Sequence, residues 1–174
     1  MSTPADTLTL RQAAFGDLET ELATTRRVLE RVPDEHFAWK PHDKSFSLGS
    51  LASHVANLPL WGTATAQSDE LDLGTNPPKL EAATDNAALL RLFDANTAEL
   101  REALGALPEE AFARDWTLRM GEKVMMKRPK ASIIRGMVIN HMVHHRGALS
   151  VYLRLLDVPV PSIYGPSADE QATF

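Results

Sequence analysis

Residues 134–152 read IRGMVINHMVHHRGALSVY, and this stretch decides how the rest of the chain is interpreted. Six of its residues recur at alternating steps of four and three positions: Ile134, Val138, His141, His145, Ala148 and Tyr152. This spacing puts them on one face of an α-helix. Residues four positions apart on such a face have Cβ atoms about 5–6 Å apart, so two imidazoles there can converge on one point. The stretch predicts a helix from Pro129 or Lys130 to Leu156 whose inward face carries two histidines.

Three further segments upstream show the same helical spacing of apolar residues. The first should end before Pro33, because the residue preceding a proline disfavours the helical conformation. The second opens at Ser47, a residue type that caps helix N-termini, and contains Pro59, which should kink it. The third ends at Pro108. The expected ranges are about Asp6–Arg31, Ser47–Gln67, and Thr84 or Asp85 to Leu107.

Two longer connections join these helices, and their compositions predict different local structures. Residues 68–83 are rich in aspartate, glycine, asparagine and proline, which favours an exposed loop that includes Asp72 and Gly74. Residues 116–119 and 123–126 flank a Met-Gly-Glu turn and are consistent with a short β-hairpin between the third and fourth helices. We therefore expect an all-α fold class, a single domain over residues 1–174 built as a four-helix bundle with that short hairpin. The two longer connections permit helix orders other than up-and-down, and the tail at residues 162–167 should not be helical.

The composition excludes several classes of protein. The chain has 174 residues, 44% of them hydrophobic, which is enough for one domain with a sizeable core. It has no cysteine, so we expect no disulfide, no cysteine-ligated metal and no cysteine nucleophile. A formal net charge of -5 argues against nucleic acid as a partner, and no apolar run reaches the roughly 18–20 residues of a membrane span. The first residues lack the features of a secretory signal, so we expect a cytoplasmic protein.

Three of the histidines fall on inward faces of two helices. His54 lies between Leu51 and Leu58 in the second helix, and His141 and His145 lie in the last. Three imidazoles can supply the ligands of a catalytic zinc site, which keeps one position open to water or substrate. The spacing therefore indicates these three histidines as candidate ligands of a divalent metal. An inward histidine is more often a core residue held by a hydrogen bond, so the spacing alone leaves both interpretations open.

The residues around the paired histidines and the other three histidines exclude some kinds of metal site. Met142 follows His141, so the motif lacks the glutamate base of H-E-x-x-H and does not support that protease mechanism. His144 is rotated by about 100° from its neighbour on the helix and is expected to lie outside the ligand set. His36 and His42 fall in the connection between the first two helices and are expected to be surface or packing residues.

Two segments carry a resemblance to a known family. PHDKSFSLGSLASH at residues 41–54 is similar to the entrance of the second helix in the DinB family of DinB/YfiT-like metalloenzymes. HMVHHRGAL at residues 141–149 resembles that family's H-x-x-x-H-R-G-Q-L signature on its last helix. The similarity continues through residues 151–161 and into the tail at residues 164–170. One residue departs from the signature, because Ala148 stands where glutamine is usual.

The resemblance implies a four-helix bundle with an atypical helix order and a divalent metal held by His54, His141 and His145. Characterised relatives include transferases that use a low-molecular-weight thiol, and a maleylpyruvate isomerase lies in the wider superfamily. We therefore expect a metal-dependent enzyme, a thiol transferase or a hydrolase, that contains zinc or nickel and acts on a small-molecule substrate. Any reacting sulfur must come from the substrate, since the chain has no cysteine.

Two other functions compete with the enzyme. One is a non-catalytic, metal-stabilised stress-response protein, in which the ion links two helices and contributes to folding. The other is a homodimeric interaction protein in which Trp39, Trp61 or the proline-rich tail forms the partner surface. Both tryptophans are also explained by core packing.

Polar residues near the inward faces are candidates to support the ligands. A histidine ligand usually donates its second ring nitrogen to an acceptor, and Asn57, Asn96 and Glu99 are the candidate acceptors. Asn96 is equally explained by a hydrogen bond between helices. Arg146 is expected to form a salt bridge on the bundle surface, with binding of an anionic substrate group as the alternative.

Overall fold

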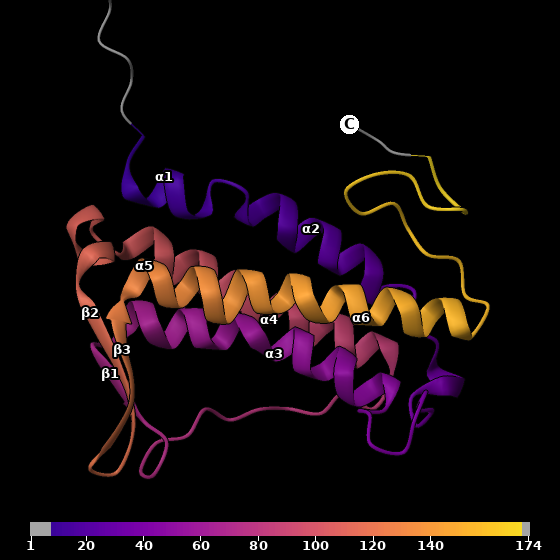
Figure 1. Cartoon of the computed structure of the whole chain (residues 1–174), viewed down its shortest axis with the longest axis horizontal. Coiled ribbons are helices and arrows are strands. Elements are labelled where there is room, and N and C mark those ends of the chain that lie inside the picture. Colours follow the sequence, from indigo (N-terminus) through magenta and orange to yellow (C-terminus); the bar gives the residue numbers. More distant parts are fainter. Residues whose placement is uncertain (1–7, 172–174) are drawn as a thin grey trace, which may run out of the picture.

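The structure is a computed structural model and describes residues 8–171. Helices form most of the chain, and a small sheet lies at one end of them (Figure 1). The helices are α1 Leu10–Phe15, α2 Leu18–Leu29, α3 Leu48–Gln67, α4 Asn86–Ala106, α5 Lys130–Ile133 and α6 His141–Leu155. The strands are β1 Glu70–Asp72, β2 Asp115–Met120 and β3 Lys123–Pro129. Within these described residues, no helix is both long and apolar enough to cross a membrane.

Four long helical segments form the bundle: α2, α3, α4 and the segment that runs from α5 through α6. Helix α3 packs against α4 and α6, and α2 packs chiefly against α4 and α6 as well. The consecutive helices α2 and α3 therefore lie on opposite sides of α6 (Figure 1). This arrangement departs from the simple up-and-down order, and the long connection at residues 30–47 makes it possible.

The hydrophobic core runs along the bundle between these helices. Most apolar positions at the predicted helical spacing are buried, and they include Leu22, Leu29, Leu51, Leu58, Leu89, Phe93, Leu100, Ile134 and Val138. Leu8, expected on the inward face of the first helix, is instead 65% exposed. Each fully buried side chain of this kind contributes about 1.5–3 kcal/mol relative to an exposed one. The packing holds α3 beside α6 and so determines which faces of these two helices meet.

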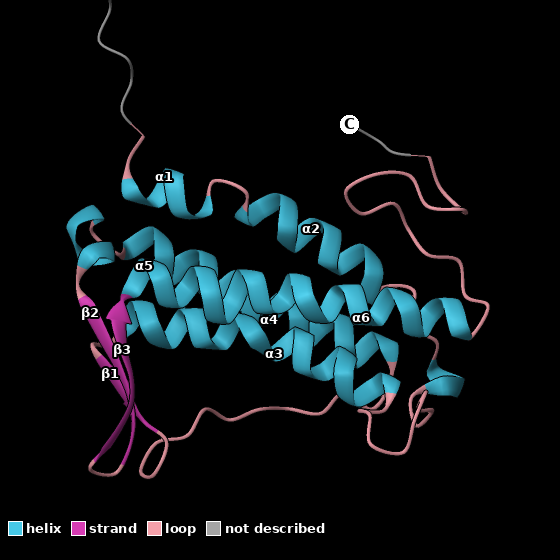
Figure 2. Cartoon of the chain, viewed as in Figure 1, coloured by secondary structure: helices cyan, strands magenta, loops and turns pink. Residues whose placement is uncertain are grey.

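The sheet corrects the all-α prediction. The predicted hairpin is confirmed as the antiparallel pair β2 and β3, and β1 pairs with β2 in parallel to complete a three-stranded sheet (Figure 2). Strand β1 lies inside residues 68–83, which were predicted to be loop. It is only 3 residues long and buries only Leu71, so it shows no alternation that sequence reasoning could detect. Leu71 packs with Trp116 and Ile133, which ties the sheet to the bundle.

The first predicted helix is divided in two, so a single helix from Asp6 to Arg31 was wrong. Gly16 and Asp17 separate α1 from α2. Glycine disfavours a helix interior, and the carboxylate of Asp17 is paired with Arg135, whose Nη1 lies 2.6 Å away. The expected start at Asp6 lies outside the described residues, and α2 ends before Pro33 as predicted.

The second and third helices begin where the sequence predicts. Ser47 Oγ accepts a hydrogen bond from Ser50 N at 3.1 Å, and Asp85 Oδ1 accepts one from Ala88 N at 2.7 Å. These caps satisfy backbone donors that the first helical turn leaves without partners. Helix α3 continues through Pro59 as one element.

The last helical segment changes its winding before the first of the paired histidines. Residues Ile134–Asn140 are π-helical and connect α5 to α6 without a loop. A π-helix has wider turns than an α-helix and is found frequently at functional sites. The segment ends directly before His141, so it helps to set the direction in which that residue faces. The spacing of apolar residues did not reveal this change.

Candidate metal centre

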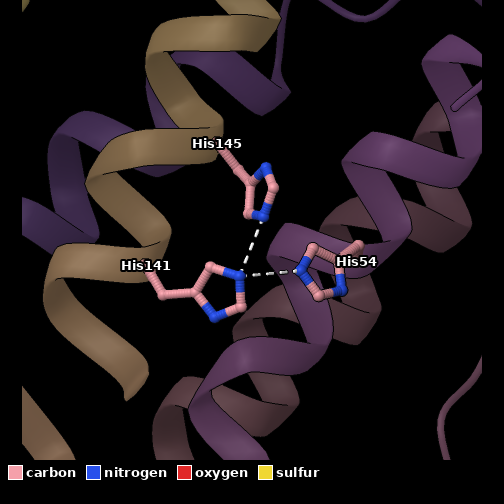
Figure 3. Close-up of side chains that lie close together, drawn as sticks. All are labelled: His54, His141 and His145. Carbon is pink, nitrogen blue, oxygen red and sulfur yellow. Dashed lines mark hydrogen bonds between the residues drawn. The ribbon is translucent and has the colours of Figure 1, made fainter. Parts of the chain in front are cut away.

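Three histidines from two helices meet between α3 and α6. His54 lies in the second turn of α3, His141 is the first residue of α6, and His145 follows one turn later. Nε2 of His141 lies 2.8 Å from Nε2 of His145 and 3.3 Å from Nε2 of His54. Figure 3 shows the three rings pointing toward one another. The structure thus brings together all three residues that the sequence indicated as candidate ligands.

The packing of the two helices explains why these rings converge. His54 is flanked on α3 by buried Leu51 and Leu58, which face the same side of the helix. On α6, Met142 and Leu149 are buried in the same core. The three histidines lie at the edge of this core and are each partly buried, so they remain in contact with solvent.

The donor set fits a divalent metal ion. One ligand nitrogen from each of His54, His141 and His145 lies within 4.8 Å of the others. Two nitrogens bound to a tetrahedral ion at about 2.0–2.1 Å are about 3.3–3.4 Å apart. The separation of His54 and His141 matches this value, whereas the 2.8 Å between His141 and His145 is shorter. Imidazole suits zinc, nickel, copper and iron. Within residues 8–171 no second group of three potential ligand side chains comes as close together.

The protonation of the rings also favours a metal. Burial, and next the neighbouring His141, lower the pKa of His54 below its ordinary value of 6.5. Burial lowers the pKa of His145 to about 4, assisted by the nearby His54, His141 and His144. Two of the three rings are therefore neutral at pH 7, which is the form that binds a metal ion.

Two aromatic rings flank the three histidines. The ring of Phe46 is inclined by 15° to that of His54 with 6.1 Å between centroids, and Phe46 is 56% exposed. The exposed ring of His144 lies 4.8 Å from that of His145 and does not join the group of three. Sequence reasoning missed the contact of Phe46, because the turn that brings it back onto α3 leaves no periodic signal.

The other histidines lie where the sequence placed them, away from this cluster. His36 is partly buried in a short turn of 3-10 helix, residues Asp34–His36. His42 is exposed, and its Nδ1 accepts a hydrogen bond from Lys44 N at 3.1 Å. Ala148, the departure from the family signature, is partly buried against the core.

The residues expected to support the ligands have other partners. Asn57 Nδ2 donates to the carbonyl oxygen of Glu81 at 2.7 Å and so holds the connection between α3 and α4. Asn96 Nδ2 donates to the carbonyl oxygen of Ala56 at 2.9 Å, which confirms the alternative of a hydrogen bond between helices. Glu99 is exposed. These side chains stabilise the bundle around the site rather than orienting its imidazoles.

Arg146 is buried, so its predicted place on the surface was wrong. The residue is 1% exposed, and its Nη2 lies 2.7 Å from Oε2 of Glu21 in α2. Its Nη1 donates to Thr25 Oγ1 at 3.2 Å, and its guanidinium lies over the ring of Tyr164. The predicted salt bridge is therefore present, but α2 and the tail cover it. Because Glu21 already neutralises this guanidinium, the structure does not favour its use for an anionic substrate.

A surface hollow lies away from the histidines. It has a volume of about 320 Å³ and is lined by Arg11, Phe15, Gly16, Leu18, Glu19, Arg101, Leu104 and Gly105. These residues belong to α1, α2 and α4 and to the break between the first two helices. The chemistry of the histidine cluster is therefore separate from this hollow.

The fold and the cluster together define a helical bundle that carries three convergent histidines between two of its helices. The chain belongs to the DinB family, whose family model matches residues 1–173. It is 26% identical over 160 residues to the uncharacterised protein YrdA of Bacillus subtilis (strain 168), and the aligned region covers 90% of this chain and 89% of that protein. It is also 26% identical over 139 residues to the uncharacterised protein YjoA of the same strain, covering 75% of this chain and 80% of YjoA.

Two solved structures share the fold. A DinB-like protein from Bacillus cereus ATCC 10987 aligns with a TM-score of 0.67 and 20% identity, covering 88% of this chain and 97% of that one. The DinB-like protein YjoA from Bacillus subtilis aligns with a TM-score of 0.68 and 20% identity, covering 92% and 99%. The family predicted from the two sequence segments is thereby confirmed, and the arrangement of helices is that of DinB-like proteins.

Proposed function

We propose that this DinB-family protein binds zinc or nickel through His54, His141 and His145 and is a metal-dependent enzyme. The reaction we propose is transfer of a low-molecular-weight thiol to an electrophilic small molecule. The observation that supports this proposal is the convergence of three partly exposed imidazoles on one point. Three protein ligands leave a coordination position open to a small molecule.

Three imidazole ligands determine what a bound metal ion could contribute to the reaction. A divalent ion on three neutral ligands lowers the pKa of a bound thiol or water, which supplies an anionic nucleophile near neutral pH. The chain's own contribution is to hold the three rings together, with His54 and His145 in the neutral form because their pKa values are lowered. The reacting sulfur belongs to the substrate, because the chain has no cysteine.

A combined metal analysis and activity assay tests the proposal. The purified protein is analysed for metals and then incubated with a cellular thiol and a chromogenic electrophile such as a chlorodinitrobenzene. We expect turnover that requires both metal and thiol, that is lost in His145→Ala and that persists in His144→Ala. Turnover of an ester without thiol would favour a hydrolase instead.

A second candidate function is a metal site that only stabilises the fold. It is supported by the origin of the ligands, because an ion on His54 and His141 would link α3 to α6. Absorption of the cobalt-loaded protein separates the two functions. A spectral change on adding thiol indicates an open coordination position, and an unchanged spectrum indicates a closed one. The homodimer stays a prediction, which light scattering with and without metal can check.

A further inference from the structure

Phe46 is an exposed apolar ring placed directly beside the candidate metal centre. It is 56% exposed, and its ring lies nearly parallel to that of His54 with 6.1 Å between centroids. Most large apolar side chains near α3 are buried in the core, whereas this ring keeps apolar surface in contact with water beside one of the three histidines. Small-molecule sites are lined mainly by hydrophobic and aromatic side chains beside a few polar groups, and this ring next to three imidazoles has that combination.

We propose that Phe46 is a specificity-determining residue that selects substrates with an aromatic or alkyl group next to their metal-binding atom. The inference rests on the proposed function and adds the substrate class to it. The ring extends the surface of the His54 imidazole toward solvent. A molecule whose donor atom binds between the three histidines would lay its adjacent apolar group on this ring.

The segment that carries Phe46 is held in place by contacts with α6 and α3. The hydroxyl of Tyr152 on α6 donates to the carbonyl oxygen of Phe46 at 3.4 Å. The ring of Tyr152 packs edge-on against Trp39 with 5.7 Å between centroids, and Leu48 N donates to the carbonyl oxygen of Trp39 at 2.9 Å. The segment is thus attached both to α6 and to the start of α3. Such preorganisation reduces the entropy that a substrate must lose when it binds.

The neighbour of His145 is polar, unlike the neighbour of His54. The exposed imidazole of His144 lies 4.8 Å from the ring of His145. The candidate site therefore has one apolar flank at His54 and one polar flank at His145. This asymmetry gives a bound molecule an orientation, with its apolar group toward Phe46.

Two thiols with the same binding atom and different substituents provide the test. Phenylmethanethiol and 2-mercaptoethanol are titrated into the full-length, cobalt-loaded protein, and thiolate binding is followed by the charge-transfer absorption of cobalt. We expect Phe46→Ala to reduce the preference for phenylmethanethiol by about tenfold, while binding of 2-mercaptoethanol changes by less than about twofold. Phe46→Leu should keep most of the preference. Val151→Ala, at an apolar residue of α6 that is 57% exposed, is the matched control and should leave it unchanged.

The outcomes separate this inference from the proposed function. An unchanged preference in Phe46→Ala with intact cobalt binding, or an equal loss of both thiols, would overturn the inference and leave the metal site standing. Failure of the wild-type protein to bind cobalt would overturn the proposed function itself. A smaller mass of Phe46→Ala in light scattering would also overturn the inference, because the ring would then belong to an interface between two copies of the chain.

Discussion

Arg146 and Glu21 form an ion pair inside the bundle, with Nη2 of the arginine 2.7 Å from Oε2 of the glutamate. The two residues are 1% and 5% exposed. The hydroxyl of Tyr164 donates to the same carboxylate at 2.8 Å, so a residue of the tail completes the cluster. Because Arg146 directly follows His145, this pair attaches the part of α6 that carries the candidate ligands to α2.

Removing one member of this pair should destabilise the protein strongly. Arg146→Leu leaves the carboxylate of Glu21 buried without a cation, which costs about 3–5 kcal/mol in the free energy of unfolding. The double variant Glu21→Leu with Arg146→Leu should recover most of this loss. Arg101→Ala, which removes an exposed pair with Glu19, is the control and should cost about 1 kcal/mol or less. Urea unfolding measures all of these, and a double variant as unstable as the single one would contradict the assignment.

A second prediction concerns the packing of residues 37–47, the segment that includes Phe46, against α3. A Cβ at Gly49 would overlap the ring of Phe37 and lie 3.1 Å from its carbonyl oxygen. Gly49→Ala should therefore lower the free energy of unfolding by about 1–3 kcal/mol. At Gly147 no atom lies within 4 Å of such a Cβ, so Gly147→Ala should stabilise α6 by about 0.5–1 kcal/mol. Thermal unfolding compares the two, and a neutral Gly49→Ala would mean that residues 37–47 do not pack against α3 as described.

The lowered pKa of His145 predicts a pH dependence of stability in the metal-free protein. In the unfolded chain this histidine titrates near 6.5, whereas in the folded protein its pKa is about 4. Between these values the unfolded state binds more protons than the folded state. The free energy of unfolding therefore falls as the pH decreases from 6.5 toward 4. Below pH 4 this histidine is protonated in both states and causes no further change. His145→Gln should show a weaker fall across the same window. Identical pH profiles for the two proteins would contradict the assigned pKa.

Removal of the metal should leave the bundle folded. The core is formed by buried apolar side chains of all four helical segments, whereas the three histidines are only partly buried. Treatment with a chelator should therefore preserve the helical circular dichroism signal, and re-addition of zinc should raise the melting temperature. At a free zinc concentration of a hundred times its Kd, the gain is about 2.7 kcal/mol. Loss of helical signal on chelation would favour the purely structural metal site.

The sequence predicted the elements whose signals are local. The spacing of apolar residues located α3, α4 and α6, and Ser47 and Asp85 marked two helix starts through their capping side chains. The same spacing put His54, His141 and His145 on inward faces, although only the family resemblance made a shared site the preferred interpretation. Their actual separations depend on how α3 packs against α6.

What the sequence did not reveal depends on contacts between distant segments. Strand β1 is defined by its pairing with β2, and Leu71 packs against Trp116 and Ile133 from distant parts of the chain. The burial of Arg146 depends on Glu21 and on the tail, which lie far from it in sequence. No local pattern encodes such pairings, so Arg146, the charged residue next to His145, was predicted to lie on the surface.

The metal content of four variants tests the central claim most directly. Wild-type protein, His54→Ala, His141→Ala, His145→Ala and His144→Ala are purified in parallel, loaded with zinc, freed of excess metal and analysed by mass spectrometry for bound metal. The three-histidine site predicts that the first three variants lose nearly all bound zinc, while His144→Ala binds as much as the wild type. Full zinc content in His145→Ala would contradict the site.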